Sequence, residues 1–188
     1  MESIVVSTSS GYDLLRKSEL HLRAIVDRYL RQLCSRPYDV DESGHERWEE
    51  IHFDRIFQFM DEGDQKRFKQ NLDEMYDIRC KRLNNDCKPT FDRSLINMLS
   101  SSTLGQLWHV FIKWSWKGFF DEILDPLHKY RSKNDWKSSV FDPLLEWRNA
   151  ANHYNDEELS DETLSKANDI ASSLCRDIER WLSNNYRS

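Results

Sequence analysis

The sequence contains few of the residues that interrupt helices. Among its 188 residues there are only five glycines and four prolines. Folds made of many short strands need these residues at their turns, so their scarcity favours long helices. Aromatic residues, by contrast, are abundant, with seven tryptophans, seven tyrosines and nine phenylalanines. Because each ring buries a large area, they can fill a globular core although only 38% of the residues are hydrophobic.

Cysteine is also sparse, and its four positions are scattered: Cys34, Cys80, Cys87 and Cys175. No CxxC pair occurs, and no cysteine–histidine pairing has the spacing of zinc ligands. The sequence therefore predicts free thiols, as in proteins of the reducing cytosol, and neither a metal site nor another cofactor.

Long hydrophobic runs and an excess of basic charge are missing as well. No apolar run approaches the roughly 18 residues of a membrane span, and the first ten residues lack the basic and apolar regions of a signal peptide. We therefore expect a cytoplasmic protein without a membrane partner. The net charge of −6 argues against broad, non-specific affinity for nucleic acid. It still allows an enzyme that holds one or two phosphates in a local basic pocket.

Hydrophobic periodicity predicts three helices in the first half of the chain, at about residues 11–34, 45–61 and 64–83. Residues 1–10 precede them as an N-terminal arm. The first helix carries its apolar residues along one side, starting at Tyr12. In the second helix they lie nearly all round, so we expect it to be sandwiched between other elements or to face a partner.

Further helices are expected in the second half. Thr103 and Gln106 have the spacing of a capping box, and an aromatic segment that should form a buried helix follows them. Asp135 is a candidate N-cap for the next helical region. Pro143 either begins a helix there or kinks one that begins near Trp136. An amphipathic helix then runs through the C-terminal part of the chain.

The stretch Leu144–Tyr154 combines residue types that occur together nowhere else in the sequence. In an apolar, helix-favouring context it brings together an arginine, two amides and a histidine, which are Arg148, Asn149, Asn152 and His153. Arginine offers a planar fork of donors that matches phosphate oxygens, and histidine exchanges protons near neutral pH. These residue types could hold a phosphate and move a proton, and this is the role that the following resemblance implies.

The pattern R-N-x-x-x-H from Arg148 to His153 resembles the R-x4-6-H signature of the HEPN superfamily. These are small all-helical domains, many of which are metal-independent ribonucleases. Segments similar to those of several HEPN branches occur here in the family's order, at residues 20–25, 104–108, 116–120, 144–153, 159–160 and 178–181.

The likeness covers about residues 12–34 and 92–182. Residues 45–61 have no counterpart and are interpreted as an insertion. The resemblance therefore implies one all-α domain over residues 1–188, a HEPN-like bundle of about five to six helices.

The resemblance also implies what the motif does. His153 would act as general acid or base and Arg148 as a clamp on the phosphate, with Asn149 assisting catalysis and Asn152 and Tyr154 binding the substrate. The substrate would be RNA, cut when a ribose 2′-hydroxyl attacks the adjacent phosphate. By family association the enzyme would belong to a toxin–antitoxin or phage-defence system, with a cognate antitoxin or another regulatory protein as partner.

The spacing of the motif raises the question of how its residues meet. Five positions place Arg148 and His153 roughly 140° apart on an ideal helix. Either the helix loosens near Asn152 or the site combines residues of two chains, and the resemblance implies the second, a homodimer. Two alternatives stay open. One is an inactive adaptor that binds RNA, a nucleotide or a protein. The other is a structural role, in which Arg148 pairs with Glu146 or Asp156 and His153 is a satisfied histidine at a helix terminus.

Overall fold

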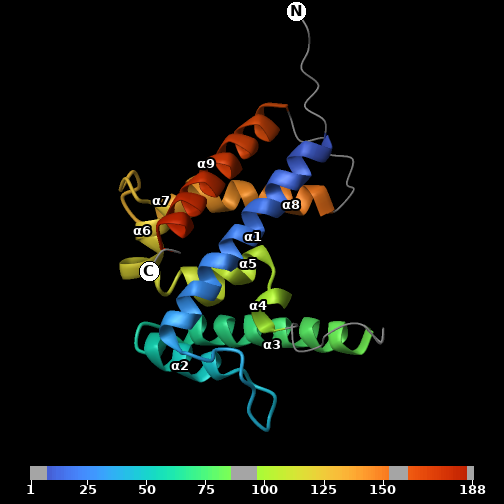
Figure 1. Ribbon diagram of the computed structural model, residues 1–188, viewed down its shortest axis with the longest axis vertical. Coiled ribbons are helices and arrows are strands. Elements are labelled where there is room, and N and C mark those ends of the chain that lie inside the picture. The colour runs from blue at the N-terminus through green and yellow to red at the C-terminus, as the bar shows by residue number, and fades with distance from the viewer. Residues whose placement is uncertain (1–7, 86–96, 153–160, 186–188) are drawn as a thin grey trace, which may run out of the picture. The chain divides into compact units, whose positions relative to one another are not determined.

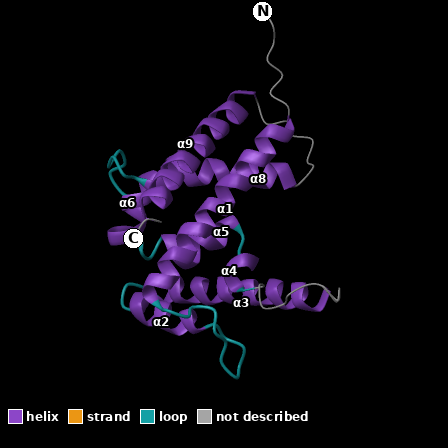
Figure 2. Ribbon diagram, in the orientation of Figure 1, coloured by secondary structure: helices purple, strands orange, loops and turns teal. Residues whose placement is uncertain are grey.

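The computed structural model describes residues 8–85, 97–152 and 161–185 (Figure 1). In this part of the chain, helices are the only regular secondary structure (Figure 2). The sole β pairing described there is an isolated antiparallel bridge between Val40 and Glu46. The predicted all-α class is therefore confirmed. No helix in the described ranges combines the length and the apolar character that crossing a bilayer requires.

The chain forms two compact units. The terminal unit comprises residues 1–22 and 117–188, and the central unit comprises residues 23–116. Helix α1 (Thr8–Leu33) contributes its first part to the terminal unit and its second part to the central unit. The expectation of a single domain over the whole chain, with residues 45–61 as an insertion, stays a prediction.

The central unit continues from α1 through four elements: α2 (Arg47–Phe57), α3 (Glu62–Asn85), α4 (Met98–Ser101), and α5 (Leu104–Gln106), which extends as the π-helical η2 (Leu107–Ile112). The helices expected at 11–34, 45–61 and 64–83 are thus present as α1, α2 and α3, with ends shifted by a few residues. One side chain departs from the predicted pattern: Tyr12 is 51% exposed rather than part of the apolar stripe of α1.

The predicted capping box at the start of α5 is confirmed. The backbone N–H of Gln106 donates to Thr103 Oγ1 (3.3 Å), and the N–H of Thr103 donates to Gln106 Oε1 (2.8 Å). The aromatic segment behind it is buried, as expected, but most of it winds as a π-helix. It ends at a turn in which Gly118 has φ +83°, a backbone conformation that favours glycine, and the chain enters the terminal unit there.

The core of the central unit contains a hydrogen-bonded chain of polar side chains among aromatic rings. His52 Nε2 donates to the carbonyl of Val110 (2.7 Å), so in the neutral ring Nδ1 is an acceptor. Tyr29 Oη donates to that Nδ1 (3.0 Å), and Ser115 Oγ donates to Tyr29 Oη (2.6 Å). The ring of His52 also stacks on Phe111, with centroids 5.6 Å apart. Each donor has an acceptor, so this buried network is satisfied without a charge.

Burial of His52 makes stability depend on pH. Burial lowers the pKa of His52 to about 4 from its ordinary 6.5, although the hydrogen bond to Val110 opposes the shift. Below pH 6.5 the unfolded chain binds a proton that the folded chain excludes. The free energy of unfolding should therefore be fully retained above pH 6.5 and fall by about 1.4 kcal/mol per pH unit towards pH 4.

Urea titrations across this pH range would measure the slope. In His52→Gln the total stability should be lower, and its pH dependence should be shallower by that amount. His128→Asn is the matched control, because His128 is exposed and has φ +47°, which asparagine tolerates. An equal pH slope in the wild type and His52→Gln would contradict the prediction.

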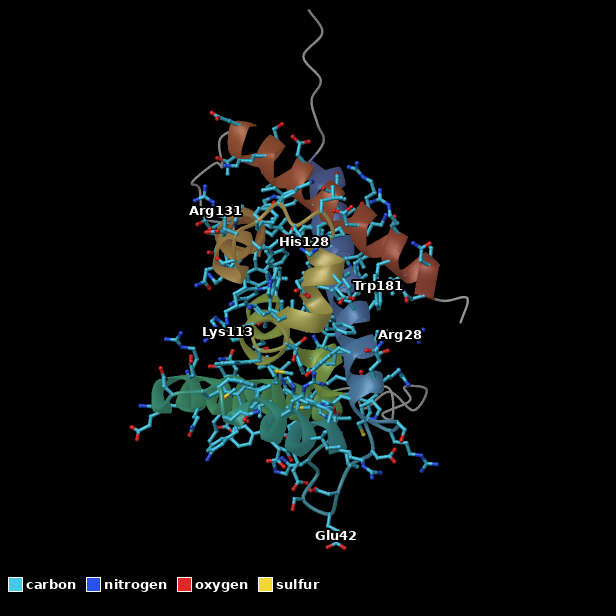
Figure 3. The ribbon with its side chains drawn as sticks, turned by 90° about the vertical axis from the view of Figure 1, so that its left-hand side faces the viewer. Arg28, Glu42, Lys113, His128, Arg131 and Trp181 are labelled. Carbon is cyan, nitrogen blue, oxygen red and sulfur yellow. The ribbon has the colours of Figure 1, made fainter. Side chains whose placement is uncertain are left out.

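The terminal unit adds its remaining elements after the turn at Gly118, within η3 (Trp116–Phe120): α6 (Asp121–Leu124), α7 (Lys133–Trp136), η4 (Lys137–Phe141), α8 (Asp142–Asn152) and α9 (Asp161–Asn185). Helix α9 packs against both α6 and α8. Its buried residues recur at helical spacing, at Ala167, Ala171, Leu174 and Ile178. Trp181 lies near its end (Figure 3). The ring of Trp181 meets the ring of Phe119 edge-on, with centroids 5.9 Å apart.

Candidate functional site

Residues 148–152 of the motif lie on α8, which continues a helix that begins nine residues before it, at Lys133. Ser132 caps this helix by accepting from the N–H of Asp135 (3.2 Å), so the prediction of Asp135 as N-cap is wrong. Serine takes this role because its short hydroxyl reaches the free N–H groups of the first turn. The backbone stays helical through η4 into α8.

Pro143 therefore lies inside a helix rather than at its start. Proline lacks an N–H, and in a regular α-helix its ring would press against the carbonyl four residues before it. Here the turn before Pro143 is wider, because the N–H of Asp142 donates to the carbonyl of Lys137, five residues back. Such a π-helical turn relieves the crowding and lets the helix continue to the motif. Of the two interpretations of Pro143, the helix that begins before the proline is the observed one, and it starts at Lys133 rather than near Trp136.

Helix α8 has a buried side and an exposed side. Leu144 is fully buried and Trp147 is 4% exposed, which fixes the rotation of the helix against the terminal unit. Glu146 and Asn149 are exposed on the other side. Arg148 is half-buried at the border between the two sides. A guanidinium at such a border can keep its stem on apolar surface while its head stays accessible.

The structure places two of the five predicted site residues in full. Arg148 and Asn149 are neighbours in the last two turns of α8. Asn152 is the last residue of that helix, and its side chain lies outside the described residues, as do His153 and Tyr154. Arg148 forms no ion pair with Glu146, although both belong to the described part of the chain. The structural role through Glu146 that the sequence left open is therefore not observed.

A histidine that sequence reasoning missed lies elsewhere in the terminal unit. His21 Nδ1 is 2.7 Å from the carbonyl of Lys17, and Nε2 is 3.1 Å from Glu179 Oε1 on α9. Because both partners are acceptors, both contacts are hydrogen bonds only when the ring carries two N–H groups. Lys17 Nζ also contacts Glu179 Oε1, at 2.8 Å.

This cluster joins two of the segments that resemble HEPN proteins, residues 20–25 and 178–181. The hydrogen bond from Lys17 is the main reason that the pKa of Glu179 is lowered, and Glu179 in turn raises the pKa of Lys17. The side chains of Lys17 and Glu179 are half-exposed, so their attraction adds little to stability. The four-residue spacing of Lys17 and His21 on one helix was the available sequence signal, whereas Glu179 is 158 positions from His21.

Metal ligands do not gather anywhere in residues 8–85, 97–152 and 161–185: no group of three or more His, Cys, Asp or Glu side chains there could hold an ion. Comparisons of the chain with protein-family models, with curated proteins and with solved structures found no match. The likeness to HEPN domains thus rests on the motif and on the order of the segments around it.

The two sides of α8 should respond differently to truncation. Trp147→Ala should lower the free energy of unfolding by about 3–5 kcal/mol, because it empties a buried site. Arg148→Ala and Asn149→Ala should change it by no more than about 1 kcal/mol, since neither side chain fills the core. Urea unfolding followed by circular dichroism would measure all three. A loss at Arg148 as large as the loss at Trp147 would assign the arginine to the core and remove it from the site.

Proposed function

We propose that the protein is a metal-independent endoribonuclease of the HEPN type. The observation that supports this most is the motif itself: Arg148 and Asn149 stand at the accessible border and exposed side of α8, and His153 follows directly after that helix in the sequence. The helix lies in the chain between a buried aromatic helical segment and the amphipathic α9, as in the family it resembles.

The proposed reaction breaks one phosphodiester bond in RNA. The 2′-oxygen of a ribose forms a bond to the adjacent phosphorus as the bond to the 5′-oxygen of the next nucleotide breaks. The products are a 2′,3′-cyclic phosphate and a free 5′-hydroxyl. His153 takes the proton from the 2′-hydroxyl or gives one to the leaving 5′-oxygen, and water serves as the partner in the other proton transfer. Arg148 neutralises the charge that gathers on the phosphate oxygens, and Asn149, Asn152 and Tyr154 position the phosphate and the neighbouring nucleotide.

The proposal includes a homodimer. On one ideal helix, Arg148 and His153 point in directions about 140° apart, too far round to grip the same phosphate. Two chains paired about a two-fold axis would let the arginine of one face the histidine of the other. Each dimer would then hold two identical composite sites.

Substitution at the two central residues tests the chemistry. Arg148→Ala and His153→Ala should each lower the rate of RNA cleavage by about 10²–10⁴-fold, and the double variant should be little worse than either, because the two act in one transition state. Cleavage by the wild type should be unchanged in EDTA. The matched control is Arg176→Ala, an exposed arginine of α9 in the same unit, which should cleave at the wild-type rate.

Three results would contradict the nuclease proposal. The first is cleavage that is untouched by His153→Ala, and the second is loss of cleavage in EDTA that a divalent ion restores. The third is the absence of cleavage by a folded wild-type protein that still binds RNA, a nucleotide or a protein. This last result would favour the inactive adaptor, the alternative that the sequence left open.

Mixing the two inactive variants tests the composite site. A heterodimer of Arg148→Ala and His153→Ala contains one site with both native residues and one site with neither. Mixed chains, refolded together, should therefore recover about one quarter of the wild-type activity if subunits pair at random and each site works alone. Each variant refolded by itself is the control. No recovery in a mixture that forms heterodimers would place both residues of a site on one chain.

The biological setting in the proposal is a toxin–antitoxin or phage-defence system. In such a system the nuclease would be held inactive by a cognate antitoxin or another regulatory protein until it is needed. This setting rests on the resemblance alone.

A further inference from the structure

An open groove lies in the central unit. It has a volume of about 1040 Å³ and runs between the loop before α2, α2 itself and α3. Figure 1 shows α2 and α3 lying side by side, and Figure 3 shows Glu42 at the tip of that loop, pointing away from the helices. The groove is separate from the motif on α8, which belongs to the other unit.

Part of the groove lining, which we call its floor, is apolar. Ile51 and Phe53 of α2 and Leu72 of α3 line it, and all three side chains are only half-buried. The ring of Phe53 also contacts Phe57 (5.2 Å between centroids), which is 47% exposed, so the apolar surface extends past the groove along α2. Trp48, on the inner side of α2, is fully buried. Helix α2 therefore has one apolar side in the core and another at the surface. The expectation that it faces a partner stays a prediction.

The charged part of the lining, which we call the rim of the groove, is mostly acidic. Six carboxylates line the groove, against two cationic side chains, Arg47 and Lys69. One of the six, Glu46, is buried and bonded to its own unit. The others are Asp39, Asp41, Glu49, Glu50 and Asp73, and all but Glu49 are exposed. The groove therefore has a negative potential that favours a positively charged occupant.

Some of these carboxylates raise the pKa of His45. This histidine lines the groove, and its side chain is 60% exposed. Its Nδ1 lies 3.0 Å from Glu49 Oε2, and this hydrogen bond is the main reason that the pKa of His45 is raised. Asp41 and Asp73 raise it further. The imidazole also stacks on Tyr76 of α3, with centroids 6.2 Å apart and planes at 19°. A flat aromatic surface thus adjoins the carboxylates.

Buried contacts hold together the elements that line the groove. The carboxylate of Glu46 accepts from Trp48 Nε1 (2.7 Å) and from the backbone N–H of Met98 (2.9 Å). Arg79 of α3 lies 3.7 Å from the same carboxylate and donates to the carbonyl of Gly44 (3.2 Å). These contacts tie the loop, α2, α3 and the start of α4 together. A binding surface fixed in this way loses little entropy when a ligand docks.

We propose that this groove binds an amphipathic, basic helix of a partner protein. The apolar side of that helix would rest on Ile51, Phe53 and Leu72, and its arginine or lysine side chains would face the carboxylates of the rim. A helix lying in an apolar groove is a common mode of peptide recognition. Charge complementarity selects this occupant: the rim would repel the phosphates of a nucleic acid, and the apolar floor offers nothing to a small hydrated cation.

Synthetic peptides provide the probe. The panel consists of helix-forming peptides with leucines at helical spacing and arginines on both flanks, each paired with a version in which glutamate replaces arginine. Fluorescence anisotropy of labelled peptides with the full chain should show binding of the basic versions only. Binding should weaken as salt rises, because the screening length falls from about 10 Å at 0.1 M to about 3 Å at 1 M.

Charge reversal locates the site. Glu50→Lys together with Asp73→Lys should weaken binding of the basic peptides by at least about tenfold, since two attractive charges become repulsive. The matched control is Asp54→Lys with Asp77→Lys, which makes the same change of net charge on the exposed surface of the same two helices, outside the groove lining. The control should weaken binding less than the groove variant does, because its two positions, although one helical turn from Glu50 and Asp73, lie outside the groove lining and do not face the peptide directly.

All four substituted positions are exposed, so both double variants should fold, and circular dichroism verifies this. Three outcomes would overturn the proposal: no binding of any basic peptide at about 100 µM, equal weakening by the two double variants, or a single-stranded RNA that displaces the bound peptide from the groove. None of them depends on RNA cleavage, so the groove and the nuclease proposal can fail independently.

Discussion

The central unit depends on one buried carboxylate, that of Glu46. Taking a carboxylate out of water is costly, and burial accordingly raises the pKa of Glu46, while Trp48, the N–H of Met98 and Arg79 act in the opposite direction. Each of these partners comes from a different part of the unit. Glu46 and Glu49 also form the capping box that begins α2. Because a buried carboxylate must keep its partners, the loop before α2, α2, α3 and the start of α4 are held in one arrangement.

Local patterns in the sequence predicted most of the fold. The periodicity of α1, α2 and α3 and the box at Thr103 are properties of neighbouring residues, and the structure confirms them. The π-helical turns were not predictable in the same way, because they depend on how a side chain such as Pro143 fits against its own helix. The capping residue before α7 was misplaced by three positions, since serine and aspartate are similar N-caps and only the backbone geometry decides between them.

Only those features of the candidate site that depend on residues close together in the sequence were predictable. The accessibility of Arg148 and Asn149 follows from their positions relative to Leu144 and Trp147, and these positions were visible in the sequence. The pairing of His21 with Glu179 and that of Glu46 with Met98 were not visible, because nothing local marks partners so far apart in the chain. The groove was not predictable for the same reason, because its carboxylates come from a loop and two helices and meet only in the folded unit.

The division into units also bears on the order in which the protein is built. The central unit is one uninterrupted segment, residues 23–116, whereas the terminal unit combines the first 22 residues with residues from 117 onwards. On the ribosome, the central segment therefore emerges complete while the first part of α1 still lacks α8 and α9. Domains generally fold as units during synthesis, the earlier one first. The groove can thus form co-translationally, whereas the unit that carries Arg148 closes only when the last helix has been made.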